Sequence, residues 1–523
     1  MSAIITDQFR ILNSSNLLSS IGSSLFSYYS FVGLTNSSEY KSDWDSSPQP
    51  PIDSFDYQND IWDTIIGLKK INSGDVRQVI RKITWTSGTT YDMYRNDVSR
   101  DKRSVPSNQS SIYSANYYVV NSDFNVYICL YNGIDPENTE GRPSLDEPTF
   151  TDLEPRSAGT SGDGYIWKYL YTIKPSDVVK FESLNYIPVP ADWNDDQYSL
   201  VRNNADTSGQ LKIVTVTNRG SGLTQGTYTN IDIIGDGSGA KASVVVGEDS
   251  TVESVNVTLG GSGYTFGKLD LASGGLLLNS GSVAPKFNVI IPPPGGHGKD
   301  IYKELGSYNL LLYSRIENDI ENPDFVSGNK VARVGIIKNP KKFQTNELLS
   351  DSIVSGVYAL KLTGITNPND YQNATFADNA EIIQTIGAGI TAVGKVVYYD
   401  NKTGVLKYWQ DRSLVGFNTG TSDLSTEIPA YGYKLNRFTS SPTVDGSLVI
   451  EGGNINLQID SNFNGITTTI NNTTTYNLGQ NFDSGLSNPE VEKYSGEIIY
   501  IDNRPSVIRS TNQKEDIKVI LQF

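Results

Sequence analysis

The segment YIWKYLYTI, residues 165–173, carries an aromatic ring at every second position. Because a strand sends alternate side chains to opposite faces of a sheet, this period predicts a β-strand with four rings on one face. Ile166 and Leu170 make the other face apolar too, which is typical of a strand inside a sandwich or beneath another domain. A core position is the favoured interpretation, and a surface that stacks sugars is the alternative. The rings belong to Tyr165, Trp167, Tyr169 and Tyr171.

Short strand-like segments of this kind run through the whole chain. Of its 523 residues, 47 are Gly and 31 are Tyr, whereas only 2 are Met. Turn formers combined with Tyr, Val, Ile and Thr suit short strands and tight turns, and few segments favour long helices. The chain is also too long for a single hydrophobic core. We therefore predict a mainly β, multidomain, sandwich-like body with a few short helices and inserted Gly-rich β domains.

Three other segments have clear local signals. Residues 4–27 are the best helix candidate, with Asp7 as a possible cap. Residues 395–410 predict a hairpin whose turn is Asp400–Gly404. The low-complexity segment at 467–481 fits either an ordered strand or a mobile loop. The apolar residues at helical spacing in the first segment are Phe9, Ile11, Leu12, Leu17 and Leu18.

An internal duplication marks residues 205–290. GSGLT, beginning at Gly220, aligns with GSGYT, beginning at Gly261, at an offset of 41 residues (261 − 220). The preceding segments VTVTNR and VNVTLG align at the same offset. The pattern predicts a repeated unit of strand, Gly-rich turn and strand. Two copies are too few for an extended solenoid, so we expect a small β domain.

Shifts in composition divide the chain into five predicted parts. Aromatic density falls and Gly content rises near residue 205, and the Pro-Gly segment at 291–300 leads back to strand-like sequence. The predicted parts are an N-terminal body of helix plus β at 1–204, the duplicated Gly-rich β domain at 205–290, a return to the β body at 291–345, a second inserted β-rich region at 346–485, and C-terminal strands at 486–523 that complete the body.

Charge and special residues exclude several classes of function. The formal net charge is −16, so we expect no nucleic-acid partner, and the basic segments 100–103 and 338–342 are interpreted as solvated loops. A single Cys and a single His exclude an internal disulfide and a Cys/His zinc site within one chain. No apolar run approaches the ~20 residues of a membrane span, and the N-terminus lacks a signal pattern. We therefore expect no membrane partner.

No residue pattern indicates catalysis, so we predict no enzyme, no catalytic or metal-binding residues and no cofactor. His297 lies between glycines, without a second His or a Cys nearby, and is expected to be a loop histidine. Cys129 is interpreted as a buried structural thiol. The Gly-rich segments 235–240 and 387–394 precede strand-like sequence, which favours turns over phosphate loops. Two acidic pairs of the type used in glycoside hydrolysis are expected by chance among 58 Asp and Glu residues: Asp43 with Asp45, and Asp60 with Asp63.

Several segments, in the same order, resemble one known family. They are similar to the gene-eight baseplate wedge protein of T-even-type contractile-tailed bacteriophages. The matches fall within residues 4–200, 300–345 and 490–523, whereas the family has no counterpart of 205–290 or of most of 345–485. The segments are ITDQFRILNSSNLLSSIG (5–22), NDIWDTIIGLKKI (59–71), GDGYIWKYLYTIKP (162–175), FVSGNKVARVGIIKNP (325–340), SGEIIYIDNRPSVI (495–508) and IKVILQF (517–523).

The resemblance implies a non-enzymatic, mostly β structural subunit of the baseplate wedge. Such a subunit forms a homodimer within each wedge, contacts other wedge proteins, and holds its neighbours together during assembly and tail contraction. Its expected location is the tail baseplate of the virion, after assembly in the host cytoplasm. The many Tyr residues suit this role, since Tyr combines apolar area with a hydroxyl at interfaces.

The two insertions are not covered by the resemblance, and they leave a second function open. The duplicated Gly-rich domain at 205–290 could contact glycans. The alternative hypothesis is therefore a tail-associated carbohydrate-binding or depolymerising protein that uses its inserted β domains. Binding of glycans by the insertion would distinguish this class of protein from a purely structural subunit.

Overall fold

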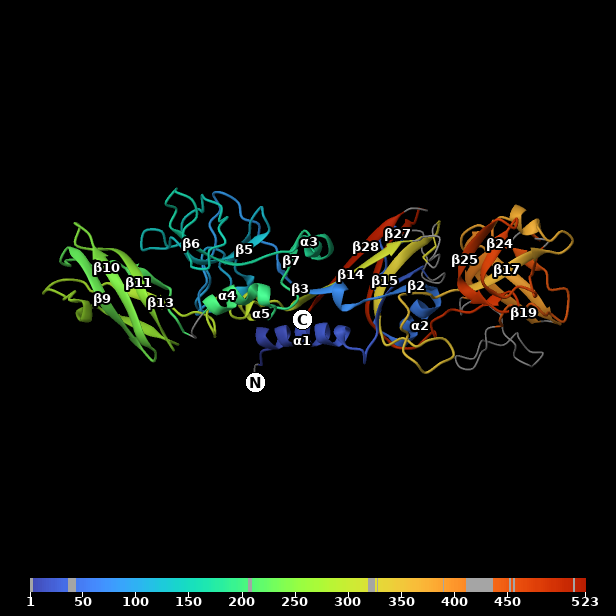
Figure 1. The fold of residues 1–523 in the computed structure, drawn as a ribbon, viewed down its shortest axis with the longest axis horizontal. Coiled ribbons are helices and arrows are strands. Elements are labelled where there is room, and N and C mark those ends of the chain that lie inside the picture. Colours follow the sequence, from blue (N-terminus) through green and yellow to red (C-terminus); the bar gives the residue numbers. More distant parts are fainter. Residues whose placement is uncertain are drawn as a thin grey trace. The chain divides into compact units, whose positions relative to one another are not determined.

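The computed structural model (Figure 1) describes residues 3–35, 44–205, 209–317, 325–326, 328–388, 390–410, 436–450, 453–454, 457–510 and 513–523. Strands account for 41% and helices for 13%, so the protein is mainly β, with several sheets and a few short helices. The predicted fold class is therefore confirmed.

The chain forms two compact units, each built from separate stretches of sequence. The first unit comprises residues 1–18, 76–312 and 519–523, and the second comprises 19–75 and 313–518. The duplicated segment 205–290 lies entirely in the first unit, and the second predicted insertion, 346–485, lies entirely in the second. The finer five-part division stays a prediction, and residues 411–435 of the second insertion lie outside the described residues.

The first unit contains a three-stranded sheet in the order β4-β5-β6. These strands are Tyr118–Val120, Asn125–Asn132 and Tyr165–Thr172. They contribute to a large aromatic core, and the predicted strand at 165–173 lies inside it. Further elements of this unit are β3 (Val76–Arg81), β7 (Tyr186–Pro188), α3 (Pro175–Phe181), α4 (Ser199–Asn204) and α5 (Ile301–Glu304).

The duplicated segment folds into two sheets with a hydrophobic core of its own, drawn from residues 211–291. A four-stranded sheet has the order β11-β10-β9-β12, and β8 pairs with β13 in a second sheet. Strands β9, β10, β11 and β13 are labelled in Figure 1. The strands are β8 (Ile213–Asn218), β9 (Gly226–Gly235), β10 (Ser238–Val246), β11 (Val252–Ser262), β12 (Gly267–Asp270) and β13 (Lys286–Ile290).

The two copies of the duplication have matching turns. Gly220 and its counterpart Gly261 have φ values of 69° and 60°, and Gly222 and its counterpart Gly263 have 67° and 79°. This left-handed region favours glycine, which explains why the GSG sequence occurs in both copies. The turns connect β8 to β9 and β11 to β12, so the predicted unit of strand, turn and strand is confirmed.

The second unit contains a five-stranded sheet in the order β16-β2-β1-β15-β27. Helix α2 (Phe55–Thr64) precedes β2 directly, and Ser54 caps it by accepting a hydrogen bond from the Tyr57 backbone. Buried residues of α2, β1, β2 and β15 share one hydrophobic cluster. The strands are β1 (Tyr28–Gly33), β2 (Ile65–Lys70), β15 (Lys330–Lys338), β16 (Ile353–Ser355) and β27 (Glu497–Ile508).

A further sheet of the second unit has the order β22-β21-β18-β19-β20-β17-β23, with a separate core from residues 358–486. The predicted hairpin at 395–410 is confirmed as β19 and β20, and the segment at 467–481 is an ordered hairpin of β24 and β25. The strands of this sheet are β17 (Tyr358–Gly364), β18 (Glu381–Gly387), β19 (Ile390–Asp400), β20 (Val405–Trp409), β21 (Leu448–Ile450), β22 (Gly453–Asn454), β23 (Leu457–Ile459) and β26 (Leu486–Ser487), which pairs with β17. The hairpin strands are β24 (Gly465–Ile470) and β25 (Thr474–Phe482). Two further strands of the chain, outside this sheet, are β14 (Asn309–Glu317) and β28 (Lys514–Gln522).

The N-terminal helix is shorter than predicted. Helix α1 spans Asp7–Gly22, and the hydroxyl of Thr6, not Asp7, accepts a hydrogen bond from the Phe9 backbone at its start. The apolar residues at helical spacing do not share one buried face, because Phe9 and Leu12 are about half exposed whereas Ile11 is buried. Among the helices of the described ranges, none has the length and apolarity to cross a membrane.

Candidate functional site

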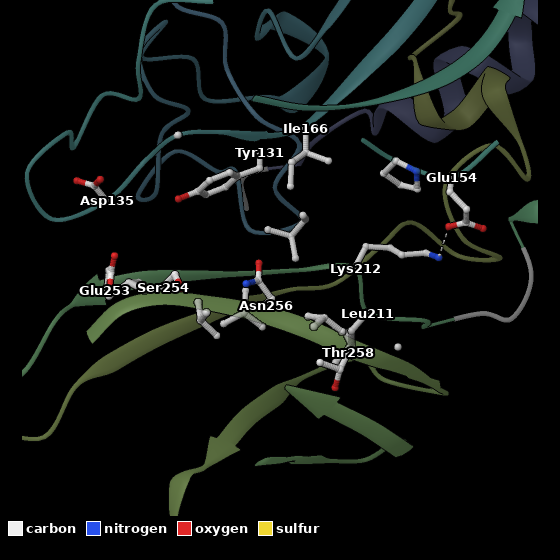
Figure 2. Close-up of a pocket in the computed structure, with 18 of the residues that line it drawn as sticks. Tyr131, Asp135, Glu154, Ile166, Leu211, Lys212, Glu253, Ser254, Asn256 and Thr258 are labelled. Atoms are coloured by element: carbon white, nitrogen blue, oxygen red, sulfur yellow. Dashed lines mark hydrogen bonds and ion pairs between the residues drawn. The ribbon is translucent and has the colours of Figure 1, made fainter. Parts of the chain in front are cut away.

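A cleft of about 660 Å³ opens in the first unit between the duplicated domain and the region of β5 and β6 (Figure 2). Its volume lies within the range of ligand sites in proteins. Tyr131 and Ile166 lie on one side of the cleft, and Ser254 and Asn256 lie on the other. The sequence did not predict this site, since its two sides come from distant segments.

Strands β8 and β11 form the side contributed by the duplicated domain. They are hydrogen-bonded at both ends, from the Leu211 N–H to the Gly260 carbonyl and from the Val252 N–H to the Arg219 carbonyl, each at 2.9 Å. Between these bonds every residue is described, and no backbone hydrogen bond joins the strands. Apart from the Glu253 carbonyl, which accepts a hydrogen bond from the Arg219 side chain at 3.3 Å, their facing edges therefore leave main-chain donors and acceptors without a partner among the described residues.

Polar side chains of β11 extend this surface. Val255 and Val257 pack against the core of the domain, whereas the alternate residues Ser254 and Asn256 belong to the opposite face. Figure 2 shows the Asn256 carboxamide pointing into the cleft. The side-chain oxygen of Gln210, at the same end as Leu211, is buried without a hydrogen-bond partner in the described part of the chain.

Ion pairs link the two sides of the cleft. At one end, Asp135 pairs with Arg142 at 2.8 Å and with Arg219 of the duplicated domain at 3.5 Å. At the other end, Lys212 pairs with Glu154 at 3.3 Å, as the dashed line in Figure 2 marks. The Asp135–Arg219 and Lys212–Glu154 pairs cross from the β5–β6 region to the domain, and all three pairs neutralise charge at the ends of the cleft.

The acidic members of these pairs are held in their charged forms. A hydrogen bond from the Asn204 side chain, together with Lys212, lowers the pKa of Glu154. Burial would raise the pKa of Asp135, but hydrogen bonds from the backbone of Glu137 and Asn138 outweigh it and lower that pKa. Both carboxylates therefore accept hydrogen bonds and do not donate them near neutral pH.

His297 lies in a loop, as expected, but it is buried and has a partner that the sequence did not reveal. Its Nδ1 lies 2.6 Å from Oε1 of Glu304, and the other oxygen of this carboxylate accepts a hydrogen bond from the Gly298 backbone at 2.7 Å. The ring of Tyr94 packs edge-on against the imidazole, and burial, with Glu304 nearby, raises the pKa of its phenol. Every oxygen of this carboxylate has a partner, so the pair suits a structural role.

The other predicted candidates lie in structural positions. Tyr165, Trp167 and Tyr171 are buried in the core, so the interpretation of the rings as core is confirmed and the stacking surface is wrong for them. Cys129 is fully buried, and burial raises the pKa of its thiol well above the ordinary value. The Gly-rich segments 235–240 and 387–394 lead into strands β10 and β19.

One member of each acidic pair has a hydrogen-bond partner elsewhere in the second unit. Asp45 accepts a hydrogen bond from the Ser506 backbone, and Asp63 accepts one from the Tyr494 hydroxyl. Asp43 lies outside the described residues. Within the described ranges, no group of three or more His, Cys, Asp or Glu side chains is placed to hold a metal ion.

The cleft gathers hydrogen-bonding groups that could hold a ligand, with an aromatic side chain opposite them. Comparison with known proteins does not identify that ligand: no protein family and no curated protein sequence matches the chain.

Proposed function

We propose that the chain is a structural subunit of a contractile phage tail baseplate wedge, present as a homodimer among other wedge proteins. Support comes from the family-like segments 59–71, 325–340 and 495–508, which contribute β2, β15 and β27. These strands belong to one five-stranded sheet, although they are more than a hundred residues apart in sequence. Segments that match in order and also build one sheet are expected if the resemblance reflects a shared framework.

The observation that carries the proposal is a buried network around Arg333 of β15. Its guanidinium donates to the Asn503 side chain on β27 at 2.8 Å and to the Thr64 hydroxyl at the end of α2 at 3.2 Å. It also donates to the Tyr57 hydroxyl at 3.3 Å. One side chain therefore joins the three family-like segments of this sheet. Buried networks of this kind specify one arrangement of strands, which a subunit that holds its neighbours in place requires.

The insertions are compatible with such a framework because each has a core of its own. The core of the duplicated domain uses residues 211–291, and the second inserted region has a core from residues 358–486. The hydrophobic clusters of the five-stranded sheet contain no residue of the duplicated domain, whereas one of them includes Val397 and Trp409 of the second inserted region. The sheet could therefore gain the duplicated domain without changing its own contacts, whereas the second inserted region packs against the sheet and supplies its strand β16.

The proposal is tested by assembly. The purified full chain should sediment at twice its chain mass of 57.3 kDa at micromolar concentration, and it should enter a larger complex when co-expressed with the other wedge proteins of its phage. A chain that stays monomeric and enters no complex would argue strongly against a wedge subunit.

A further inference from the structure

We propose that the cleft between strands β8 and β11 and the β5–β6 region binds an uncharged carbohydrate chain. This inference goes beyond the structural role and does not depend on it. It rests on the unpaired hydrogen-bonding groups in the cleft, on its balanced charge, on its apolar wall and on the way its ends are closed.

The side of the cleft formed by β8 and β11, here called its floor, offers both donors and acceptors of hydrogen bonds. Apart from the Glu253 carbonyl, to which the Arg219 side chain donates, the facing edges of β8 and β11 present main-chain N–H and C=O groups that no described residue pairs between the two closing bonds. The side chains of Ser254 and Asn256 make no hydrogen bond to any other described residue. The buried oxygen of Gln210 also lacks a donor. A ligand rich in hydroxyl groups satisfies such a mixture, because each hydroxyl both donates and accepts.

The charges of the cleft argue against an ionic ligand. Its cations, Arg142, Lys212 and Arg219, are each paired with Asp135 or Glu154, so no unpaired cation is left to attract an anion. Glu253 lines the cleft without an ion-pair partner among the described residues, and its carboxylate is a further acceptor for hydroxyl groups. An uncharged ligand avoids the cost of breaking these pairs.

The opposite wall supplies an apolar face. Tyr131 and Ile166 project into the cleft across from Asn256 (Figure 2). The Tyr131 hydroxyl donates to the Ile134 carbonyl at 2.7 Å, which fixes the ring in place. A sugar ring has C–H groups on its faces and hydroxyls at its edge, so it can pack on such a wall while its edge meets the polar floor.

The ends of the cleft argue against an extended peptide. A peptide that adds to a sheet edge needs that edge to be open along its length. Here the bonds between Leu211 and Gly260 and between Arg219 and Val252 close the gap at both ends. The remaining space accepts a short, compact ligand, which the rings of an oligosaccharide provide.

Because the cleft has one wall from the duplicated domain and one from the β5–β6 region, the test uses the full chain. The protein is applied to an array of uncharged and anionic glycans, and the strongest uncharged glycan is then titrated by calorimetry. Asn256→Ala should weaken binding about fivefold to tenfold, since it removes one hydrogen-bonding side chain. Asn256→Trp, which fills the cleft from an exposed strand position, should abolish binding.

Thr229→Ala is the matched control, because Thr229 is exposed on β9, two strands away from β11 in the same sheet. It should bind as the unmodified protein does, and circular dichroism should show all three variants folded. Absence of binding to any uncharged glycan, preference for anionic glycans, or binding that survives Asn256→Trp would each overturn the proposal.

Discussion

Arg333 and Asn503 are register partners on β15 and β27, and their side chains are joined by a hydrogen bond of 2.8 Å from Nε to Oδ1. Arg333 is only 1% exposed, so its charge is stabilised almost entirely by groups of the protein. The same guanidinium also donates to the Thr64 and Tyr57 hydroxyls. A lysine ammonium lacks the planar, forked set of donors that makes these hydrogen bonds possible at the same time. This network therefore makes the packing of the five-stranded sheet sensitive to a single substitution.

Arg333→Lys should lower the free energy of unfolding by about 3 kcal/mol, because it keeps a buried charge while leaving polar partners unpaired. Urea unfolding followed by circular dichroism checks this. Arg504→Lys is the control, since the Arg504 side chain is 66% exposed beside Asp502 and should change stability by less than about 0.5 kcal/mol. Equal loss in both variants would show that the network contributes nothing specific.

Trp167→Ala should destabilise the first unit by about 3–5 kcal/mol, since it removes a fully buried side chain from the aromatic core. The indole stacks on Tyr165 with 5.3 Å between ring centroids and meets Tyr91 edge-on with 5.9 Å between ring centroids. Residues on several sides of the resulting cavity would therefore lose contacts. Thermal unfolding measures the change. Leu184→Ala, at an 89% exposed position, should have almost no effect; a Trp167→Ala variant of ordinary stability would contradict the core assignment.

The duplicated turns predict a graded effect of adding a methyl group. At Gly261 an added Cβ would lie 2.5 Å from both the Ala240 nitrogen and the Ser238 oxygen, whereas at Gly263 its nearest neighbour is Gly237 at 3.8 Å. Gly263→Ala should cost about 1 kcal/mol, from its left-handed backbone alone. Gly261→Ala should cost about 2–4 kcal/mol, because the clash is added. Denaturant midpoints compare the pair directly, and equal midpoints would contradict this account of the turn.

Stability should fall at alkaline pH. Burial, with nearby Asp7 and Glu304, raises the pKa of Tyr113 to about 12, and burial raises that of Tyr302 to about 12. Unfolded tyrosines ionise near pH 10. Between about pH 10 and 12 the unfolded chain therefore binds fewer protons than the folded one, and stability decreases as pH rises.

Each such tyrosine should remove up to about 1.4 kcal/mol per pH unit in that window, whereas none contributes a pH dependence below pH 9. Urea midpoints measured from pH 8 to pH 11.5, together with tyrosinate absorbance, follow this loss. Ionisation of all tyrosines near pH 10 without any loss of stability would contradict their burial.

Local sequence patterns predicted the secondary-structure elements more accurately than they predicted the contacts between residues. The alternation in residues 165–173 and the turn at 400–404 specify strands because they depend only on neighbouring residues. The partner of His297 was missed because Glu304 lies seven residues later, at the end of α5, and no sequence pattern indicates that the two side chains meet. The spacing of Phe9 and Leu12 did identify a helix, but not which of its faces is buried.

The cleft could not be predicted for a similar reason. One side of the cleft comes from residues 131–166, and the other side, its floor, comes from residues 210–260. The floor depends on two strands, β8 and β11, that are close to each other but are not paired. The sequence pattern within each segment does not indicate how far apart the two segments lie in the folded chain. The ion pairs Asp135–Arg219 and Lys212–Glu154, which cross between the two walls, are likewise visible only once the chain is folded.

The central claim, that this chain is a homodimeric wedge subunit, is tested most directly by the mass of the complex it forms. The full chain is co-expressed with the other wedge proteins of its phage, and the purified assembly is weighed by native mass spectrometry. The account predicts two copies of this 57.3 kDa chain in each wedge complex. A single 57.3 kDa species, with no wedge protein attached, would contradict it.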